Sequence, residues 1–252
     1  MTIDWEARLK EKQIQAEVQR PGCVEAHGYK VFSQSDEDGI IAEIFRRIGT
    51  TNRIFVEFGA EVGQENNSRH LLEQGWSGLW IEGNPDYPGA IRAYFENELA
   101  AGQLKLIPEF VSVENINRFI SSAGISGDID LLSVDIDGND YHVWNAISCI
   151  APRLVVAEHN GYPPPMDWVM PYDPEFRWDG KTGAYGSSLM ANARLSAAKG
   201  YTLVATGIYS ANGFYVRNDQ LSDKFPNLGA PEDYWRPLDY EAIVNFPRRS
   251  AA

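Results

Sequence analysis

Residues 54–63 have the sequence IFVEFGAEVG, in which a short apolar run leads directly into a turn with two glycines. The apolar run 54–58 predicts a β-strand, and residues 68–74 predict a helix after the turn. Gly59 and Gly63 allow the backbone to turn sharply and a ligand to come close to it. This strand–turn–helix unit indicates an α/β fold with a ligand site at the turn.

The alternation of strand and helix continues along the chain. We expect strands at 79–81, 104–107, 130–134 and 154–157, helices at 87–101, 113–121 and 188–199, and closing strands at 201–206 and 213–217. Strands that alternate with helices predict a doubly wound, mainly parallel sheet with helices on both faces. The short turn Ser210-Ala211-Asn212 joins the last two strands and predicts a hairpin at the end of the sheet.

The other segments are expected to decorate a single domain. They are an N-terminal helical extension at 1–30, an insertion at 161–185 within a main domain at 31–220, and an irregular tail at 221–252. The insertion is rich in proline and aromatic residues. In the extension, residues 4–19 predict a helix that ends before Pro21-Gly22. The apolar side of this helix consists of Trp5, Leu9 and Ile14. Ser35 with Asp38 resembles the cap of a second helix before the first strand.

Composition limits the possible partners. The chain has 252 residues, with 22 lysines and arginines against 35 acids, which gives a formal net charge of −13. This balance argues against nucleic acid or an anionic membrane as the main partner, because both bind clustered positive charge. Two cysteines, Cys23 and Cys149, are expected to be free thiols. With no apolar segment typical of an export signal or a membrane span, a cytoplasmic location is expected.

An acid follows the second predicted strand. Glu82 lies about twenty residues past the glycine turn, where a carboxylate can accept the hydroxyls of a ribose. The turn lacks the G-x-G-x-x-G pattern of a dinucleotide site, and Glu57 and Glu61 would repel a pyrophosphate. Glu57 would instead attract the ammonium group of an amino acid. These features favour S-adenosylmethionine over a nicotinamide dinucleotide as the ligand.

Several motifs together resemble the FkbM-like family of S-adenosylmethionine-dependent methyltransferases. They are FSQ with Asp38 (32–38), FVEFGA with Gly63 (55–63), GWSGLWIEGNP (75–85), DLLSVDIDG (130–138), YGSSL (185–189) and KGY (199–201). The resemblance implies the class I methyltransferase fold, a Rossmann-like seven-stranded sheet whose last strand is antiparallel. It also implies transfer of a methyl group to an oxygen, commonly on sugars or natural products.

The resemblance assigns cofactor contacts to residues of this chain. Gly59, Ala60 and Gly63 would lie along the methionine moiety, and Glu82, followed by Gly83, would bind the ribose. Phe110 and Val111, after the third strand, would flank the adenine. Glu57 and Asp135 complete the expected set of cofactor-binding residues.

Acids also follow the fourth and fifth predicted strands. Asp135 and Asp137 end one strand, and Glu158 and His159 end the next, so all four are expected at the same edge of the sheet. Carboxylates with an imidazole suit Mg²⁺ or Mn²⁺, and we expect these four residues to be metal ligands. Asp137 or His159 would accept the proton of the acceptor hydroxyl. The arrangement is similar to that of the metal-dependent catechol O-methyltransferases. The alternative is that the acids only fix the backbone of a turn.

The sequence therefore predicts a metal-assisted, S-adenosylmethionine-dependent O-methyltransferase. Its small-molecule acceptor is expected to be a saccharide, a nucleotide-sugar or a related metabolite, with Trp168, Tyr172 and Trp178 of the insertion stacking on the sugar. Two alternatives stay open: a nicotinamide-dependent oxidoreductase, and a non-catalytic binding module with the same fold. A homo-oligomer is possible.

Overall fold

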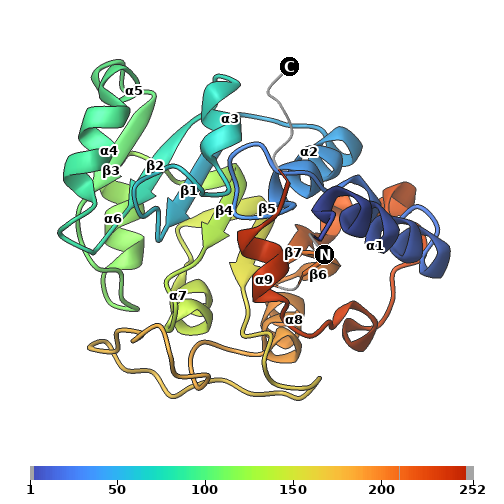
Figure 1. Ribbon diagram of the computed structural model, residues 1–252. Helices are drawn as coiled ribbons and strands as arrows, with labels where there is room; N and C mark the ends of the chain where they lie inside the picture. The colour runs from blue at the N-terminus through green and yellow to red at the C-terminus, as the bar shows by residue number, and fades with distance from the viewer. Residues whose placement is uncertain (1–2, 210, 248–252) are drawn as a thin grey trace.

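The computed structural model describes residues 3–209 and 211–247. Ser210 of the predicted turn, and residues 1–2 and 248–252 of the predicted end segments, lie outside the described residues. A seven-stranded sheet forms the centre, with the strand order β3-β2-β1-β4-β5-β7-β6 (Figure 1). Its strands are β1 (Ile54–Phe58), β2 (Ser77–Ile81), β3 (Leu104–Ile107), β4 (Gly127–Val134), β5 (Ile150–Glu158), β6 (Tyr201–Thr206) and β7 (Asn212–Arg217). Strand β7 is antiparallel to both of its neighbours, and the other neighbouring strands are parallel. The predicted fold class is therefore confirmed.

The α-helices differ from the sequence prediction at three places, the last of which lies in the predicted tail. They are α1 (Trp5–Gln19), α2 (Glu37–Ile48), α3 (Arg69–Glu73), α4 (Pro88–Tyr94), α5 (Glu96–Ala100), α6 (Ile116–Ser122), α7 (Asp140–Ala146), α8 (Leu189–Ala198) and α9 (Tyr240–Val244). The helix predicted at 87–101 is divided at Phe95, whose φ of −119° leaves the helical region. The Phe95 ring packs edge-on against Trp80, with 4.7 Å between ring centroids. Helix α7 was not predicted.

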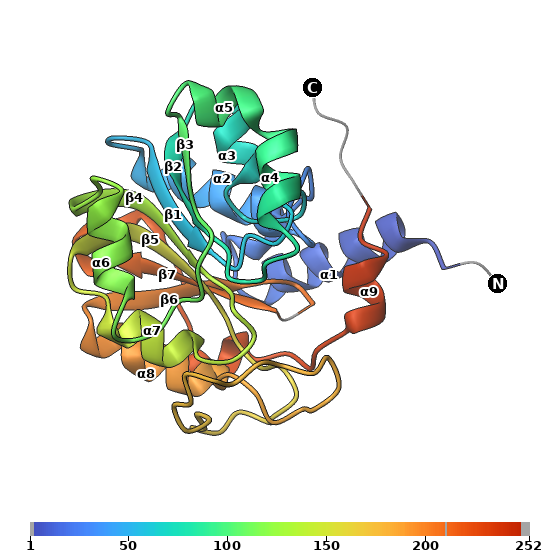
Figure 2. The same cartoon turned by 90° about the vertical axis from the view of Figure 1, so that its left-hand side faces the viewer.

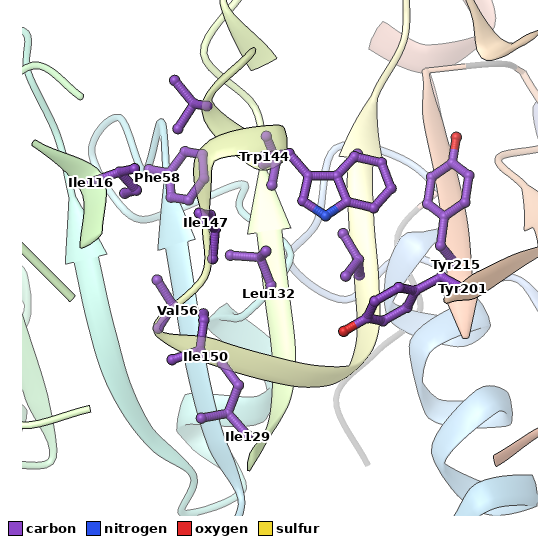
Figure 3. Close-up of a cluster of buried hydrophobic side chains, with 14 of the residues drawn as sticks. Val56, Phe58, Ile116, Ile129, Leu132, Trp144, Ile147, Ile150, Tyr201 and Tyr215 are labelled. Carbon is purple, nitrogen blue, oxygen red and sulfur yellow. The ribbon is translucent and has the colours of Figure 1, made fainter. Parts of the chain in front are cut away.

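Alternate side chains along the strands fill an apolar layer on each face of the sheet. On one face, Val56, Phe58 and Leu132 pack with Ile116 of α6 and Trp144 of α7 (Figure 3). On the opposite face, α2, α3 and α4 cover the sheet. Because helices cover both faces, the ends of the strands are the places where loops can form a ligand site.

Helices α1 and α9 lie side by side at one edge of the molecule (Figure 2). Trp5 and Leu9 of α1 join Ile243 of α9 and Ile208 of the β6–β7 connection in a separate apolar cluster. Ile14, predicted on the same side of α1, is 56% exposed. It lies five residues beyond Leu9, which turns it about 140° away from that side. The predicted irregular tail therefore contains a short α-helix, α9, that packs against the extension.

The predicted cap of the second helix, α2, is wrong because the side chain that bonds to Asp38 comes from another residue than Ser35. The backbone N–H of Asp38 donates to Ser33 Oγ at 3.1 Å, and not to Ser35. Asp38 Oδ2 in turn accepts the N–H groups of Val31, Phe32 and Ser33 at 2.7–2.9 Å. These bonds fix the chain that enters α2.

Asp36, just before α2, ties this segment to the far end of the sheet. It is fully buried, and its Oδ2 accepts the backbone N–H of Ile208 at 2.9 Å. Burial, together with the negative charge of Glu37, raises the pKa of Asp36 to about 7.

This raised pKa predicts a pH-dependent effect of Asp36→Asn on stability. A carboxyl whose pKa is higher in the folded chain contributes stability that is fully present below its unfolded pKa, near 4, and is lost as the pH rises through about 7. Asparagine carries no charge, so the variant is expected to match the wild type near pH 4 and to exceed it by about 1–3 kcal/mol at pH 8. Urea unfolding between pH 4 and pH 8 measures this. A difference that stays constant with pH would contradict it.

Two further expectations concern the chain as a whole. Cys23 and Cys149 are free, as predicted. None of the helices that the structure describes combines the length and the apolar composition needed to cross a bilayer.

Candidate cofactor and metal site

The candidate site lies at the carboxyl ends of β2, β1, β4 and β5, which are neighbours in this order. The strand order reverses between β1 and β4, and open α/β sheets bind ligands at such a point. The loops that follow these four strands carry nearly all of the residues predicted from the sequence. Phe110 and Val111 follow β3, the next strand outward.

Gly59, at the end of β1, is held against the end of β4. Its φ is +79°, and a Cβ at this position would lie 1.5 Å from the carbonyl oxygen of Asp135. Gly63 has a φ of +76°, and its Cβ would lie 2.7 Å from the rings of Phe95 and Trp80. Both glycines are therefore required for close packing of the turn on the protein itself. Ala60 between them is buried in the core.

Gly59→Ala is expected to destabilise the chain by about 3 kcal/mol or more, because the methyl group has no space and the neighbouring atom is backbone. Gly49→Ala is the matched control. Gly49 has a φ of +73° but nothing within 4 Å of the position of a Cβ. The control therefore carries only the positive-φ strain, which costs about 1 kcal/mol. Urea unfolding compares the two variants, and equal losses would contradict the close approach of Gly59 to β4.

Glu82 follows β2 and contacts the glycine turn. Its Oε2 accepts the backbone N–H of Glu61 at 2.6 Å, and its Oε1 accepts that of Asn84 at 2.7 Å. Only 6% of Glu82 is exposed, and burial raises its pKa although both N–H groups oppose the shift. The structure therefore places Glu82, which is predicted to bind the ribose, in contact with the predicted glycine turn.

Glu57 lies within β1 and is 1% exposed. Its carboxylate accepts bonds from Asn66 Nδ2, from the N–H groups of Asn67 and Ser68, and from Ser68 Oγ. Burial raises its pKa, and the bonds from Ser68 and Asn67 oppose the shift. Glu57 thus anchors the segment that leads into α3, and these donors compete with the predicted ammonium group.

Phe110 and Val111 follow β3, and Phe110 folds back over the end of β2. A Cβ on Gly83 would lie 2.2 Å from Phe110 Cδ1, so the ring packs directly on the backbone beside Glu82. Phe110 is still 46% exposed, and Val111 packs against the core. Phe110, one of the two residues predicted to flank the adenine, is therefore next to Gly83 and Glu82.

Three carboxylates meet at the ends of β4 and β5. Among the described residues, Asp135, Asp140 and Glu158 each offer an oxygen within 4.8 Å of the other two. Burial, followed by the charge of Asp137, raises the pKa of Asp135 well above its usual range. Burial and the charge of Asp135 do the same for Glu158, whose side chain is hydrogen-bonded to Asp135. Burial and the negative charges of neighbouring carboxylates thus raise the pKa values of both Asp135 and Glu158.

Asp140, at the start of α7, was missed by the sequence analysis. Its Oδ1 accepts the N–H of Ile136 at 2.7 Å and its Oδ2 accepts that of Gly138 at 2.8 Å, which fixes the loop after β4. The signal that could have found it is the helical spacing of Val143 and Ile147, which places Asp140 in the first turn of a helix.

Asp137 and His159 are not members of this group of three. Asp137 has a φ of +52°, and burial with the charge of Asp140 raises its pKa to about 6. His159 is 2% exposed, its backbone N–H donates to the carbonyl of Ala211 at 3.0 Å, and burial lowers its pKa to about 4. The structure therefore brings together two of the four predicted metal ligands, Asp135 and Glu158, and adds Asp140.

Asn160 holds both ends of the insertion. Its Nδ2 donates to the carbonyl groups of Gly183 and Tyr185 at 2.7 and 2.9 Å, and its Oδ1 accepts the N–H of Tyr162 at 3.0 Å. Tyr185 is buried, and its pKa is raised by burial and by the charge of Glu158. The phenol of Tyr185 therefore lies near the acids at the end of β5.

Two of the three predicted sugar-stacking aromatics have side-chain partners within the protein, and Trp168 is held through its backbone. Trp178 stacks on Tyr185 with 4.6 Å between ring centroids, and the Tyr172 hydroxyl donates to Glu114 at 2.8 Å. Trp168 donates its backbone N–H to Ser188 Oγ. These contacts give the insertion, which has no helix of its own, a defined path past α7 (Figure 1).

Comparisons with known proteins give similarities of fold only. No protein-family model matches the chain, and no curated protein matches it. Similar solved structures include a putative O-methyltransferase from Klebsiella pneumoniae, 14% identical over 86% of this chain and 91% of that chain, with a TM-score of 0.46. An O-methyltransferase from Bacillus cereus in complex with SAH is 14% identical over 86% of this chain and 93% of that chain, with a TM-score of 0.46. The methyltransferase domain of bacterial CtHen1-C is 11% identical over 73% of this chain and 97% of that chain, with a TM-score of 0.47.

Proposed function

We propose that this chain is an S-adenosylmethionine-dependent methyltransferase that acts on a hydroxyl group. The observation that carries this proposal is the place of Glu82, whose Oε2 lies 2.6 Å from the N–H of Glu61 in the glycine turn. A carboxylate at the end of β2 that also touches the turn after β1 is where the two ribose hydroxyls of an adenosine can be bound.

The charge of the site fits this cofactor. The residues around the turn and the end of β4 are acidic, and the largest charge effects on the pKa values of Asp135 and Asp137 come from other carboxylates. Such a site favours a sulfonium cation and opposes the pyrophosphate of a dinucleotide. S-adenosylmethionine supplies a methyl group activated by positively charged sulfur when it is bound.

The protein residues would divide the binding as follows. Gly59, Ala60 and Gly63 would line the methionine moiety, Glu82 and Gly83 the ribose, and Phe110 and Val111 the adenine, with Asp135 at the reacting end. Methyl transfer is an in-line displacement, so the contribution of these residues is mainly to hold the methyl group and the acceptor oxygen in line.

A divalent cation fits the group of three carboxylates. Asp135, Asp140 and Glu158 are hard oxygen donors, which Mg²⁺ and Mn²⁺ prefer, and a cation would relieve their mutual repulsion. A cation held there would lower the pKa of an acceptor hydroxyl. In this proposal Asp140 replaces Asp137 and His159, which were predicted to be metal ligands.

Asp137 is proposed as the base that accepts the hydroxyl proton on a carboxylate oxygen. Support comes from its charge, which acts on Asp135, Glu158 and Tyr185. His159 is the weaker candidate because the buried ring holds a proton poorly.

The acceptor is proposed to be a saccharide, a nucleotide-sugar or a related metabolite, and the chain a member of the FkbM-like family. Support comes from the order of the motifs along the chain and from Tyr162, which is 62% exposed at the entrance to the insertion. An exposed aromatic ring there offers a face for a sugar.

Two measurements test the proposal together. Calorimetric titration is expected to show binding of S-adenosylmethionine and not of NAD⁺. A screen of hydroxylated acceptors, with and without a chelator, is expected to release demethylated cofactor only with a divalent cation. Binding of NAD⁺ alone would favour the oxidoreductase, and cofactor binding without turnover on any acceptor would favour the non-catalytic module.

A further inference from the structure

Two adjacent residues of the insertion touch opposite sides of the candidate cofactor site. A Cβ on Gly138, after β4, would lie 2.6 Å from Phe176 Cδ1, so the Phe176 ring packs on that loop. The guanidinium carbon of Arg177 lies 3.8 Å from the ring centroid of Phe110. Phe110 in turn packs on Gly83, after β2. Residues 173–177 are called the strap below.

The sheet order decides what the strap crosses. Strand β1 lies between β2 and β4, and neighbouring strands are about 4.8 Å apart. A segment that contacts the loop after β4 on one side and Phe110 over the end of β2 on the other spans about 10 Å. The side chains of Phe176 and Arg177 therefore reach the loops on the two sides of β1, at whose end Gly59 begins the turn that contacts Glu82.

The two ends of the strap are held unequally. On the β4 side, Asn139 Nδ2 donates to the carbonyl of Asp173 at 2.7 Å, and the N–H of Asp173 donates to Asn139 Oδ1 at 3.3 Å. On the other side the contact is an exposed cation–π pair, since Arg177 is exposed and Phe110 is 46% exposed. Such pairs are weak at exposed sites. The Phe110 side is therefore the one that can open.

The guanidinium of Arg177 is set in place by the strap itself. Its Nη1 donates to the carbonyl groups of Phe176 at 2.6 Å and Pro174 at 3.1 Å. These two bonds orient the planar guanidinium for stacking, independently of its contact with Phe110. A lysine could not reproduce this geometry, because its ammonium group is a point charge without a flat face.

We propose that Arg177 is a positioning residue that closes the strap over the adenine end of the cofactor site. This inference rests on the proposed function, because it needs an adenosine beneath the strap. The contact between Arg177 and Phe110 slows the release of S-adenosylmethionine and of its demethylated product. Opening of that contact is the route by which they exchange, while the β4 side stays attached through Asn139.

The test is the dissociation rate of S-adenosylhomocysteine, followed by stopped-flow displacement with the full chain. Arg177→Ala is expected to raise this rate about three- to tenfold and to raise the KM for S-adenosylmethionine by a similar factor. Its kcat is expected to stay the same or to rise, because the reacting end of the site is untouched. Arg177→Lys is expected to lie close to Arg177→Ala.

Arg118→Ala is the matched control. Its guanidinium carbon also lies over an aromatic ring, 5.2 Å from the centroid of Phe119, and Arg118 is exposed on α6. The control is expected to leave the dissociation rate unchanged. Thermal unfolding of both variants separates a loss of the strap contact from a loss of fold.

Three outcomes would overturn the inference. If the wild type binds the cofactor and Arg177→Ala leaves its dissociation rate unchanged, the proposed role of the strap is refuted, while the proposed function is unaffected. A fall in kcat with unchanged cofactor kinetics would assign Arg177 to the acceptor. A wild type that does not bind S-adenosylmethionine would remove both the proposed function and the strap.

Discussion

The Glu82→Ala variant is expected to bind S-adenosylmethionine at least about a hundredfold more weakly than the wild type. The carboxylate would accept both ribose hydroxyls, and a hydrogen bond to a charged group contributes about 1.5–3 kcal/mol. Two such bonds correspond to a loss of about a hundredfold or more in affinity. Alanine also leaves the N–H groups of Glu61 and Asn84 without their present acceptor. Isothermal titration of the purified variant measures the effect.

Two companion variants show whether the loss is specific. Glu82→Gln keeps one oxygen for the turn and is expected to bind with intermediate affinity. Glu109→Gln removes the charge of an exposed glutamate after β3 and is expected to bind like the wild type. An unchanged dissociation constant in Glu82→Ala, with a folded chain, would contradict the assignment of the cofactor site.

Glu158→Gln is expected to lower kcat at least about a hundredfold while the affinity for S-adenosylmethionine stays within about threefold of the wild type. The substitution keeps the size of the side chain but removes one of the three charges that would hold a divalent cation. Removal of a charged ligand weakens a metal site far more than it changes the packing around it. The remaining activity is expected to respond little to added Mg²⁺ or Mn²⁺, which a metal titration of initial rates measures.

The comparison with the other candidate residues makes this result decisive. Asp137→Asn is expected to lower kcat as well but to keep the response to metal, because Asp137 is the proposed base. His159→Ala is expected to lower stability through a buried cavity. A His159→Ala variant that loses turnover at unchanged stability would return the role of base to His159. Full metal-dependent activity in Glu158→Gln would contradict the proposed metal site.

The sequence predicts the features that depend on local pattern. The apolar run and the glycines of 54–63 identify β1 and its turn, and the following alternation gives all seven strands. Glu82 could be predicted because the end of the next strand must lie beside that turn in a parallel sheet. The antiparallel last strand came from the resemblance, and the structure confirms it.

What the sequence does not predict depends on side-chain direction and on distant contacts. His159 follows Glu158 directly in the sequence, but only Glu158 belongs to the group of three acids, and spacing along the chain does not show which of the two side chains joins it. Asp140 is not predicted because its segment DGND (137–140) has the composition of a turn, although α7 begins there. The bond between Asp36 and Ile208 joins residues 172 apart in sequence, so only the packed fold places them together.

The apolar cluster of Trp5, Leu9 and Ile243 has a practical consequence for anyone who trims or tags this chain. The cluster includes Ile208 and Tyr209, which connect β6 to β7 at the same edge as Glu158. Proteolytic removal of α1 or α9 would expose the apolar side chains of the other helix and weaken the packing of the β6–β7 connection. Activity would then fall although every residue that touches a ligand is still present.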